Sequence, residues 1–407
     1  MNVESMVLER RGGQNPVPRR WRGLFAQLDR LRYGSLAVAL PGGHSLRYVG
    51  REHGPQGEIV IRRPWRLLRR LALRGDLGFG EAFVAGDWDS PNLADLLLVL
   101  ALNEDTLDQQ ASRGVLAQAM LSLRHALRRN SLRGSRRNIA RHYDLGNDFY
   151  ARWLDPTMTY SAAIFAEASE TLAQAQRRKY ERLLDLLDPK PGDHILEIGC
   201  GWGGFAEVAA QWGMKVTGIT LSREQLRYAQ DRAEAGGYAG QVEFRLLDYR
   251  KLDGQYDHIV SIEMFEAVGQ AYWRSYFEVL ARSLKPGGRA ALQVITIDEA
   301  LFDIYARNPG GFIQTYIFPG GMLPTRSHLH NLAAEAGLAP ERHAGFGADY
   351  ALTLQRWHAA FEAETAWLEE HGYDARFRRM WRYYLAFCEA GFRAKQIDVV
   401  QLLIERP

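Results

Sequence analysis

From residue 171 onward, the apolar positions of the chain alternate between helical and strand-like spacing. Residues 171–187 carry an apolar stripe at helical intervals and open with Thr171 and Gln174 spaced as a capping box. Apolar runs typical of strands then lie at 194–198, 214–220, 241–247, 256–262 and 289–297, and amphipathic runs typical of helices at 203–212, 222–235 and 272–284. This alternation predicts an α/β fold with a doubly wound, mostly parallel sheet, whose ligand lies at the carboxyl ends of the strands.

The first 120 residues follow a different pattern. Residues 1–15 are predicted to lack regular structure, and an amphipathic segment at 21–31, short strands within 35–61 and a buried helix at 93–102 follow them. We therefore expect a smaller N-terminal α+β domain at 1–120, an Arg-rich linker at 121–140 and a main domain at 141–407.

Composition is that of an ordinary globular protein. The 407 residues are 46% hydrophobic and 24% charged. The longest apolar run, 96–102, is far shorter than the roughly 20 residues of a bilayer span. No secretory signal opens the chain, and Cys200 and Cys388 are its two cysteines, which fits a reducing cytoplasm. No His/Cys cluster has metal-ligand spacing, so no metal site is predicted.

The basic residues are clustered, although the net charge is only +3. Arginines interleaved with Trp, Phe or Leu lie at 62–70, 124–137 and 376–382. Any one run is also typical of a solvated Arg-rich face, and such patches also serve nucleic acid. Three runs of this composition favour an anionic membrane surface instead, because the charges meet headgroups while the rings lie at the interface.

A glycine-rich turn at 199–204 joins a predicted strand to a predicted helix. Glycines there let the backbone approach a ligand closely, which by itself indicates only a nucleotide-type ligand. The second strand ends without the acid that a dinucleotide would need, and Thr220 offers a hydroxyl instead. Glu197 precedes the turn, and Asp248 follows the third strand, where its carboxylate could accept from an adenine amino group. This set matches S-adenosylmethionine-dependent methyltransferases better than dehydrogenases.

Six ordered motifs resemble the cyclopropane-fatty-acyl-phospholipid synthase family, which includes mycolic acid cyclopropane synthases. They lie at 141–150, 154–161, 218–225, 264–269, 316–321 and 346–350, and a similar tail lies at 387–392. The resemblance covers about residues 80 to 402. It implies a Rossmann-like class I methyltransferase fold and a lipid-associated N-terminal domain.

The same resemblance implies an activity and a cofactor site. The expected reaction moves the methyl group of S-adenosylmethionine to the cis double bond of an unsaturated phospholipid acyl chain and closes a cyclopropane ring. The partner would be the inner face of the cytoplasmic membrane, and the assembly a homodimer. The residues that correspond to the family's cofactor site are Tyr143, Tyr160, Ser161, Glu197, Gly199, Gly201, Thr220, Ser222, Gln225, Asp248 and Tyr249.

In that family a bicarbonate ion beside the reaction centre accepts the proton. By motif, its site falls on the side chains of Glu266, Gln293 and Tyr350 and on the backbones of Ala162 and Ile295. Cys388 aligns with a position that is sometimes regarded as catalytic.

Two of these positions depart from the usual pattern. Ala162 stands where Cys is common, and Gln293 stands where His is common. A Gln side chain donates an N–H but carries no positive charge at neutral pH, so anion binding should weaken.

The departure at Gln293 leaves the product open. Impaired removal of a proton from the transferred methyl group would give a methyl- or methylene-branched chain without a ring. Two further classes stay open at this level. A small-molecule methyltransferase acting on an amine or phenol would not need the N-terminal domain or the Arg-rich runs. A non-catalytic lipid-binding protein is the other, and the intact Gly199, Gly201 and Gln225 argue against it.

Overall fold

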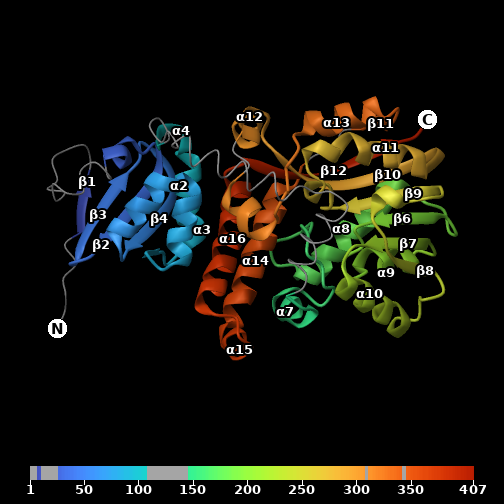
Figure 1. Ribbon diagram of the computed structural model, residues 1–407, viewed down its shortest axis with the longest axis horizontal. Helices are drawn as coiled ribbons and strands as arrows, with labels where there is room; N and C mark the ends of the chain where they lie inside the picture. Colours follow the sequence, from blue (N-terminus) through green and yellow to red (C-terminus); the bar gives the residue numbers. More distant parts are fainter. Residues whose placement is uncertain (1–6, 11–25, 108–144, 308–309, 342–344) are drawn as a thin grey trace. The chain divides into compact units, whose positions relative to one another are not determined.

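The computed structural model describes residues 7–10, 26–107, 145–307, 310–341 and 345–407. The chain divides into two compact units (Figure 1): residues 1–122, 310–312 and 365–394 form unit 1, and residues 123–309, 313–364 and 395–407 form unit 2. The segment 365–394, which we expected in the main domain, thus packs with the N-terminal residues. The division into accessory domain, linker and catalytic domain as functional parts stays a prediction.

Unit 2 contains the predicted doubly wound sheet. Its seven strands lie in the order β11-β12-β10-β9-β6-β7-β8. The pairs β9–β10, β6–β9, β6–β7 and β7–β8 are parallel, whereas β12 pairs antiparallel with both β10 and β11. The bounds are β6 His194–Ile198, β7 Lys215–Thr220, β8 Val242–Leu246, β9 Tyr256–Ile262, β10 Leu284–Ile297, β11 Ala339–Pro340 and β12 Ile397–Glu405.

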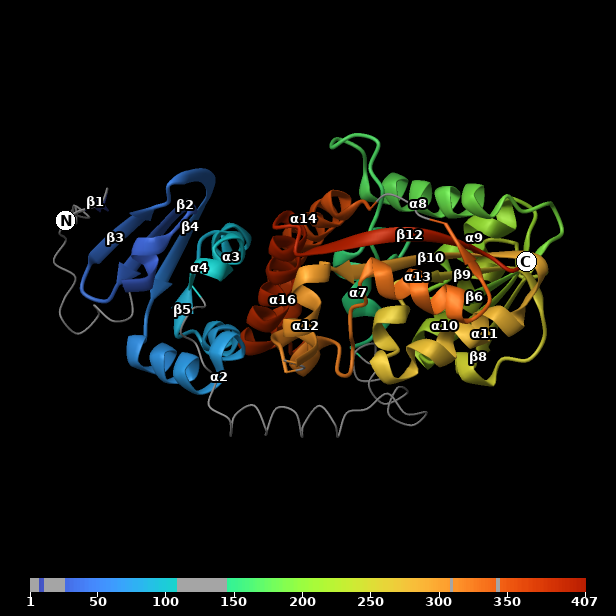
Figure 2. The same cartoon turned by 90° about the horizontal axis from the view of Figure 1, so that it is seen from above.

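Helices cover both faces of this sheet, and each face has its own apolar core. One core joins the sheet to α8, α9 and α10, and the other joins it to α11 and α13. Figure 2 shows α8 and α11 on opposite sides of the strands. The helical elements of unit 2 are α7 Asn147–Trp153, α8 Leu172–Leu187, α9 Gly204–Gln211, α10 Arg223–Ala235, η3 Tyr249–Lys251, η4 Phe265–Ala267, η5 Gln270–Tyr272, α11 Trp273–Ser283, α12 Glu299–Arg307, η6 Ile313–Ile317, α13 Arg326–Glu335 and α14 Gly347–Ala363.

Local sequence signals account for most of these boundaries. The Thr171 side chain accepts from the Gln174 N–H in the expected capping box, and the Ser222 side chain accepts from the Gln225 N–H at the start of α10. One boundary differs from the prediction. The strand predicted at 289–297 begins earlier, because β10 starts at Leu284 and its pairing with β9 shifts register between Leu284 and Arg289.

Unit 1 is built on a five-stranded sheet in the order β1-β3-β2-β4-β5. Strand β1 covers Val7–Arg10 and pairs parallel with β3, so the prediction that residues 1–15 lack structure was wrong for these four residues. Helix α16 packs on α3 and α2. The remaining elements are η2 Ala26–Arg30, β2 Tyr33–Leu40, β3 His44–Val49, β4 Glu52–Ile61, α2 Pro64–Val84, β5 Trp88–Asp89, α3 Leu93–Leu102, α4 Glu104–Leu107, α15 Thr365–Glu370 and α16 Ala375–Arg393.

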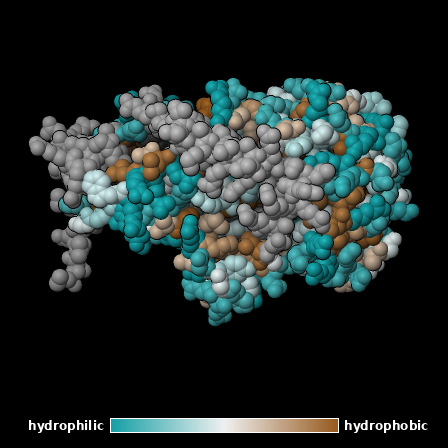
Figure 3. Space-filling model, viewed as in Figure 1, coloured by the Kyte–Doolittle hydropathy of each residue, from teal (hydrophilic) through white to brown (hydrophobic). Residues whose placement is uncertain are grey.

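Within the residues that the structure describes, no helix is long and apolar enough to cross a membrane. In the coloured part of the face that Figure 3 views, hydrophilic side chains predominate, with smaller apolar patches among them.

Candidate active site

The glycine-rich turn lies where the parallel sheet predicts it, directly after β6. The N–H groups of Gly199 and Cys200 both donate to the carbonyl oxygen of Ile219 on β7, at 2.9 and 3.0 Å. Gly199 has a φ of +87°, and a Cβ there would lie 2.9 Å from the Met264 side chain. Gly201 has a φ of +50°, with open space where its Cβ would be. Glycine is therefore required at 199 and leaves the backbone at 201 free to face a ligand.

Hydroxyl and amide groups are bonded to one another at the carboxyl end of β7. The Thr220 hydroxyl donates to the Gln225 side-chain oxygen at 2.9 Å and accepts from the Ser222 N–H at 3.1 Å. All three residues are buried, and they lie at the carboxyl end of β7, the edge of the sheet where the ligand was expected.

Asp248 and Tyr249 follow β8 at the same edge of the sheet. Two nitrogens of Arg250 donate to the two carboxylate oxygens of Asp248, at 2.8 and 2.6 Å. Burial raises the pKa of Tyr249 to about 12, so its hydroxyl stays protonated. Tyr143, the remaining residue expected near the cofactor, lies outside the described residues.

Glu197, on β6, is the acid best suited to a cationic ligand. Its side chain is buried, and no described residue bonds its Oε2 atom. Burial holds the pKa of Glu197 well above its ordinary range. A buried carboxyl oxygen without a donor fits the ammonium group of S-adenosylmethionine, and the residues of this edge therefore fit that cofactor. When bound, S-adenosylmethionine supplies an electrophilic methyl group.

Glu263, which the sequence analysis did not single out, organises a second group of side chains. Its Oε1 accepts from the Ala162 N–H and from Gln293 Nε2, both at 2.8 Å, and its Oε2 accepts from the Tyr350 hydroxyl at 2.6 Å. Three residues predicted for the anion site are thus brought together around a protein carboxylate. The available signal was an acid directly after the apolar strand 256–262.

Gln293 is fixed from both sides. It is fully buried on β10, and its Oε1 accepts from Gln401 Nε2 on β12 at 3.0 Å. Its Nε2 also approaches the Ala162 carbonyl oxygen at 3.3 Å. These partners fix the orientation of the amide group, so that its oxygen faces Gln401 and its nitrogen faces Glu263 and the Ala162 carbonyl oxygen.

Glu266 lies beside this group as a second carboxyl. Its Oε1 accepts from the Ile295 N–H at 2.5 Å, whereas its buried Oε2 has no partner among the described residues. Burial, followed by the negative charge of Glu263, raises the pKa of Glu266 to about 8. Near neutral pH, Glu266 is therefore largely protonated. Burial raises the pKa of Glu263 as well, but the hydrogen bonds from Tyr350, the Ala162 N–H and Gln293 oppose that shift and favour its carboxylate.

Lys179, on α8, brings a positive charge towards the two acids. Its Nζ donates to the Ser161 hydroxyl at 2.7 Å, and Gln176 Nε2 donates to the Ser161 carbonyl oxygen at 2.8 Å. Burial lowers the pKa of Lys179 to about 7, although the negative charges of Glu263, Asp155 and Glu197 oppose that shift. This lysine ties the 160–162 segment to α8.

The donors expected for bicarbonate are already bonded to carboxyl oxygens of the protein. The Ala162 N–H, the Gln293 amide and the Tyr350 hydroxyl bond Glu263, and the Ile295 N–H bonds Glu266. A bicarbonate ion at this place would also meet the negative charge of Glu263. The residues present therefore do not fit a bicarbonate ion, and we derive no step through one.

Cys388 and the residues around Glu263 fall in different units of the chain. Cys388 lies on α16, in unit 1, whereas Glu263 lies in unit 2. Burial raises the pKa of the Cys388 thiol to about 12, so it is not a thiolate near neutral pH. Its expected catalytic role gains no support from these features.

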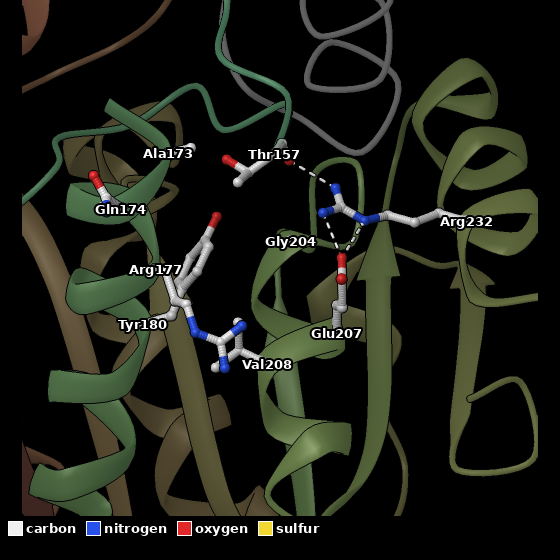
Figure 4. A pocket seen from close by; sticks show the side chains of 9 residues that line it. All are labelled: Thr157, Ala173, Gln174, Arg177, Tyr180, Gly204, Glu207, Val208 and Arg232. Carbon is white, nitrogen blue, oxygen red and sulfur yellow. Dashed lines mark hydrogen bonds and ion pairs between the residues drawn. The ribbon is translucent and has the colours of Figure 1, made fainter. Parts of the chain in front are cut away.

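A surface hollow lies between α8 and α9 (Figure 4). Its polar groups are bonded to one another: Arg232 bonds Glu207 and the Thr157 carbonyl oxygen, both at 2.6 Å, and the Tyr180 hydroxyl lies 2.8 Å from that of Thr159. These bonds hold the 157–159 segment, which leads into Tyr160 and Ser161. The remaining lining residues are Ala173, Gln174, Arg177, Gly204 and Val208.

Comparison with known proteins identifies the family. The family described as mycolic acid cyclopropane synthetase matches residues 130–402. The chain belongs to this family. It is accordingly an S-adenosylmethionine-dependent fatty acid methyltransferase of the cyclopropane-fatty-acyl-phospholipid synthase type.

Two curated relatives cover most of the chain. Tuberculostearic acid methyltransferase of Mycobacterium tuberculosis is 42% identical over 86% of this chain and 83% of its own length. Cyclopropane-fatty-acyl-phospholipid synthase of Escherichia coli K12 is 37% identical over 86% of this chain and 88% of its own length.

Solved structures agree with the fold. The cyclopropane synthase MmaA2 from Mycobacterium tuberculosis is 31% identical, with a TM-score of 0.62 over 66% of this chain and 98% of that one. A mycolic acid cyclopropane synthase complexed with SAH and CTAB shares the same values. Unit 2 therefore has the class I methyltransferase fold that the motifs implied.

Replacing Gly199 tests the cofactor turn. Gly199→Ala puts a Cβ against Met264 at a positive φ, so the turn must shift, and we expect S-adenosylmethionine affinity to fall about ten-fold or more in calorimetry. Gly237→Ala is the matched control, because Gly237 also has a positive φ but nothing lies within 4 Å of its Cβ position. Equal losses of affinity in the two variants would contradict this role of Gly199.

The pKa of Glu266 predicts a stability change with pH. Because this pKa rises from an ordinary 4.5 to about 8 on folding, the contribution of Glu266 is complete below about 4.5 and is lost as pH rises through about 8. Urea unfolding at about pH 5 and about pH 8 should show wild type losing stability relative to Glu266→Gln as pH rises. A constant difference between the two proteins would show that Glu266 titrates normally.

Proposed function

We propose that the protein transfers the methyl group of S-adenosylmethionine to the cis double bond of an unsaturated acyl chain in a phospholipid, and that the product is a methyl- or methylene-branched chain. The observation that carries the branched product is the carboxylate of Glu263 at the expected anion site. The Glu263 carboxylate is attached to the end of β9 and so accepts a proton at one fixed place, whereas a free ion can move with the substrate. A fixed acceptor favours removal of one particular proton. The relative named for tuberculostearic acid, a branched fatty acid, supports the same product.

An aromatic cluster formed by Tyr150, Trp153, Tyr160 and Trp357 suits the positive charge that methyl transfer leaves on the chain. The Tyr160 ring centroid lies 5.5 Å from that of Tyr150, 5.6 Å from that of Trp153 and 5.2 Å from that of Trp357. Tyr350, which bonds Glu263, lies 6.1 Å from Trp357 by the same measure. Ring faces attract cations, most strongly where water is excluded, so the cluster and the carboxylate can act on the same substrate cation.

Cyclopropane formation is the second candidate, and the Escherichia coli relative supports it. Both reactions share the methyl transfer. They differ in whether a hydride shifts along the chain, in which C–H bond then breaks, and in whether its electrons form a C=C bond or a ring C–C bond. A saturated branched chain would in addition need a hydride donor, which belongs to a separate reaction.

A helical face on unit 1 supports an anionic phospholipid surface as the partner. Along the first part of α2, Trp65 is 65% exposed and Leu73 59% exposed, and the exposed Arg66 and Arg69 share their face at helical spacing. The helical path breaks at Gly75, where φ is 53° and ψ −133°. An aromatic ring and an aliphatic side chain with two arginines between them match the headgroup region of a bilayer.

The other arginines of α2 face the protein instead. Arg70 pairs with the buried Asp87 at 3.1 Å, and Arg74 pairs with Glu81 at 2.5 Å. Of the other basic runs, 124–137 lies outside the described residues and 376–382 lies on α16. The homodimer and the position at the inner face of the membrane stay predictions.

The reaction is tested by product analysis. Purified protein, S-adenosylmethionine and vesicles of an unsaturated phosphatidylglycerol should yield acyl chains heavier by one CH₂ unit in mass spectrometry. NMR should show a branch beside a remaining double bond. High-field ring signals instead would favour the cyclopropane candidate, and unchanged chains would refute acyl methylation.

The membrane face is tested by vesicle binding. Combining Arg66→Glu and Arg69→Glu should weaken sedimentation with anionic vesicles about ten-fold or more, since each basic residue near the surface contributes about 1 kcal/mol. Arg274→Glu with Arg307→Glu on unit 2 is the charge-matched control, as these arginines are 71% and 76% exposed. Equal losses in both pairs would mean that net charge, and not this face, governs binding.

A further inference from the structure

Glu263 is held as a hydrogen-bond acceptor at the centre of the site. Two donors meet Oε1, and the Tyr350 hydroxyl meets Oε2. A carboxylate oxygen accepts two hydrogen bonds, so Oε1 is saturated and Oε2 keeps one lone pair for a further proton. The residue as a whole is only partly buried.

The surrounding side chains are matched to a carboxylate. Gln293 is neutral and, held by Gln401, turns an N–H towards Glu263. Lys179 lies near enough to favour the ionised form of Glu263. Burial raises the pKa of Glu263, and its three hydrogen bonds oppose that shift, whereas the burial of Glu266 favours the protonated form of that second acid.

The backbone at Glu263 is in an unfavourable conformation. Its φ is +51°, and it is one of four non-glycine residues with a positive φ among those described. Such a conformation costs of the order of 1 kcal/mol and persists where surrounding bonds impose it, often at functional sites. Here it directs the carboxyl group to the donors from the 160–162 segment, β10 and α14.

We propose that the carboxylate of Glu263 is the proton acceptor of the reaction, and that the enzyme works without a free anion. This inference rests on the proposed function and specifies its last step. After the methyl group has moved from sulfur to one alkene carbon, the substrate carries a cation. When Glu263 Oε2 takes a proton from a carbon next to the cation, the two electrons of that C–H bond form a new C=C bond and the product has a methyl branch. For a methylene branch, a hydride first shifts from the methylated carbon to the cationic carbon, and Oε2 then takes a proton from the methyl group, whose C–H electrons form the C=C bond. Loss of a methyl proton without that shift forms the ring C–C bond instead. Glu263 is then neutral and returns its proton to water.

Gln293 and Tyr350 are positioning residues in this scheme. They do not exchange protons with the substrate but hold the acceptor in place through its two oxygens. The departure from His to Gln is then consistent with the chemistry, because an uncharged amide orients a carboxylate without competing for the proton.

Two substitutions at one position test the proposal. Glu263→Gln keeps the shape of the side chain but removes its basicity, and we expect turnover to fall about 10²–10⁴-fold with S-adenosylmethionine affinity unchanged in calorimetry. Glu263→Gly relieves the positive φ and exposes the donors of Ala162, Gln293 and Tyr350. This variant should be equally inactive, and formate or bicarbonate should restore its turnover at least about ten-fold, because a small anion can enter the freed site.

Lys395→Gly is the matched backbone control, since Lys395 is an exposed residue of unit 2 with a φ of +58°. It should keep wild-type turnover and show no response to formate. Near-normal turnover of Glu263→Gln would overturn the proposed role of Glu263, and so would a Glu263→Gly enzyme that no small anion restores. Neither result would refute the proposed function. A wild-type enzyme that binds S-adenosylmethionine but changes no unsaturated phospholipid would refute the proposed function and this step with it.

Discussion

The site depends on the register of three neighbouring strands. The Glu263 N–H donates to the Gln293 carbonyl oxygen at 2.7 Å and so continues the β9–β10 ladder one residue past Ile262. On the other side of β10, Gln293 lies directly opposite Gln401 of β12. A shift of one residue in either pairing would turn the Gln293 side chain to the other face and remove the amide from Glu263. The position of the carboxylate is therefore set by backbone pairing before any side-chain bond forms.

Charge placement follows from this arrangement. Glu263 and Glu266 would repel each other if both were ionised, and burial leaves Glu266 as the protonated member near neutral pH. Lys179 supplies a partly balancing charge from α8, and its bond to the Ser161 hydroxyl connects that charge to the 160–162 segment. The segment with the expected cofactor residues Tyr160 and Ser161 thus shares one electrostatic environment with Glu263, the proposed proton acceptor. A methyl donor that is itself a cation is favoured in such surroundings.

Much of the fold could be predicted from the sequence, because its signals are local. Apolar periodicity located each central strand to within a few residues, and the residues that cap α8 and α10 stand beside the groups that they bond. The antiparallel β12 and the grouping of 365–394 with the N-terminal sheet depend on contacts between distant segments, which periodicity does not encode.

The candidate site was predictable in parts. Motifs pointed to Ala162, Gln293 and Tyr350 as ligands of an ion, and in the structure their donors bond Glu263. In the sequence, Glu263 is one acid three positions before the more conspicuous Glu266. Its partners lie about 30, 90 and 100 residues away, so only the folded chain shows that their donors converge on it. Gln293 and Glu263 bond each other, so the role of either residue can be understood only together with the other.

The central claim is that the protein carries its own proton acceptor. The most direct measurement is the turnover of the wild-type enzyme on unsaturated phospholipid vesicles, in buffer depleted of carbon dioxide and then supplemented with increasing bicarbonate. Our account predicts full turnover in the depleted buffer and no increase on addition. Turnover that is absent without bicarbonate and rises to saturation with it would contradict the account.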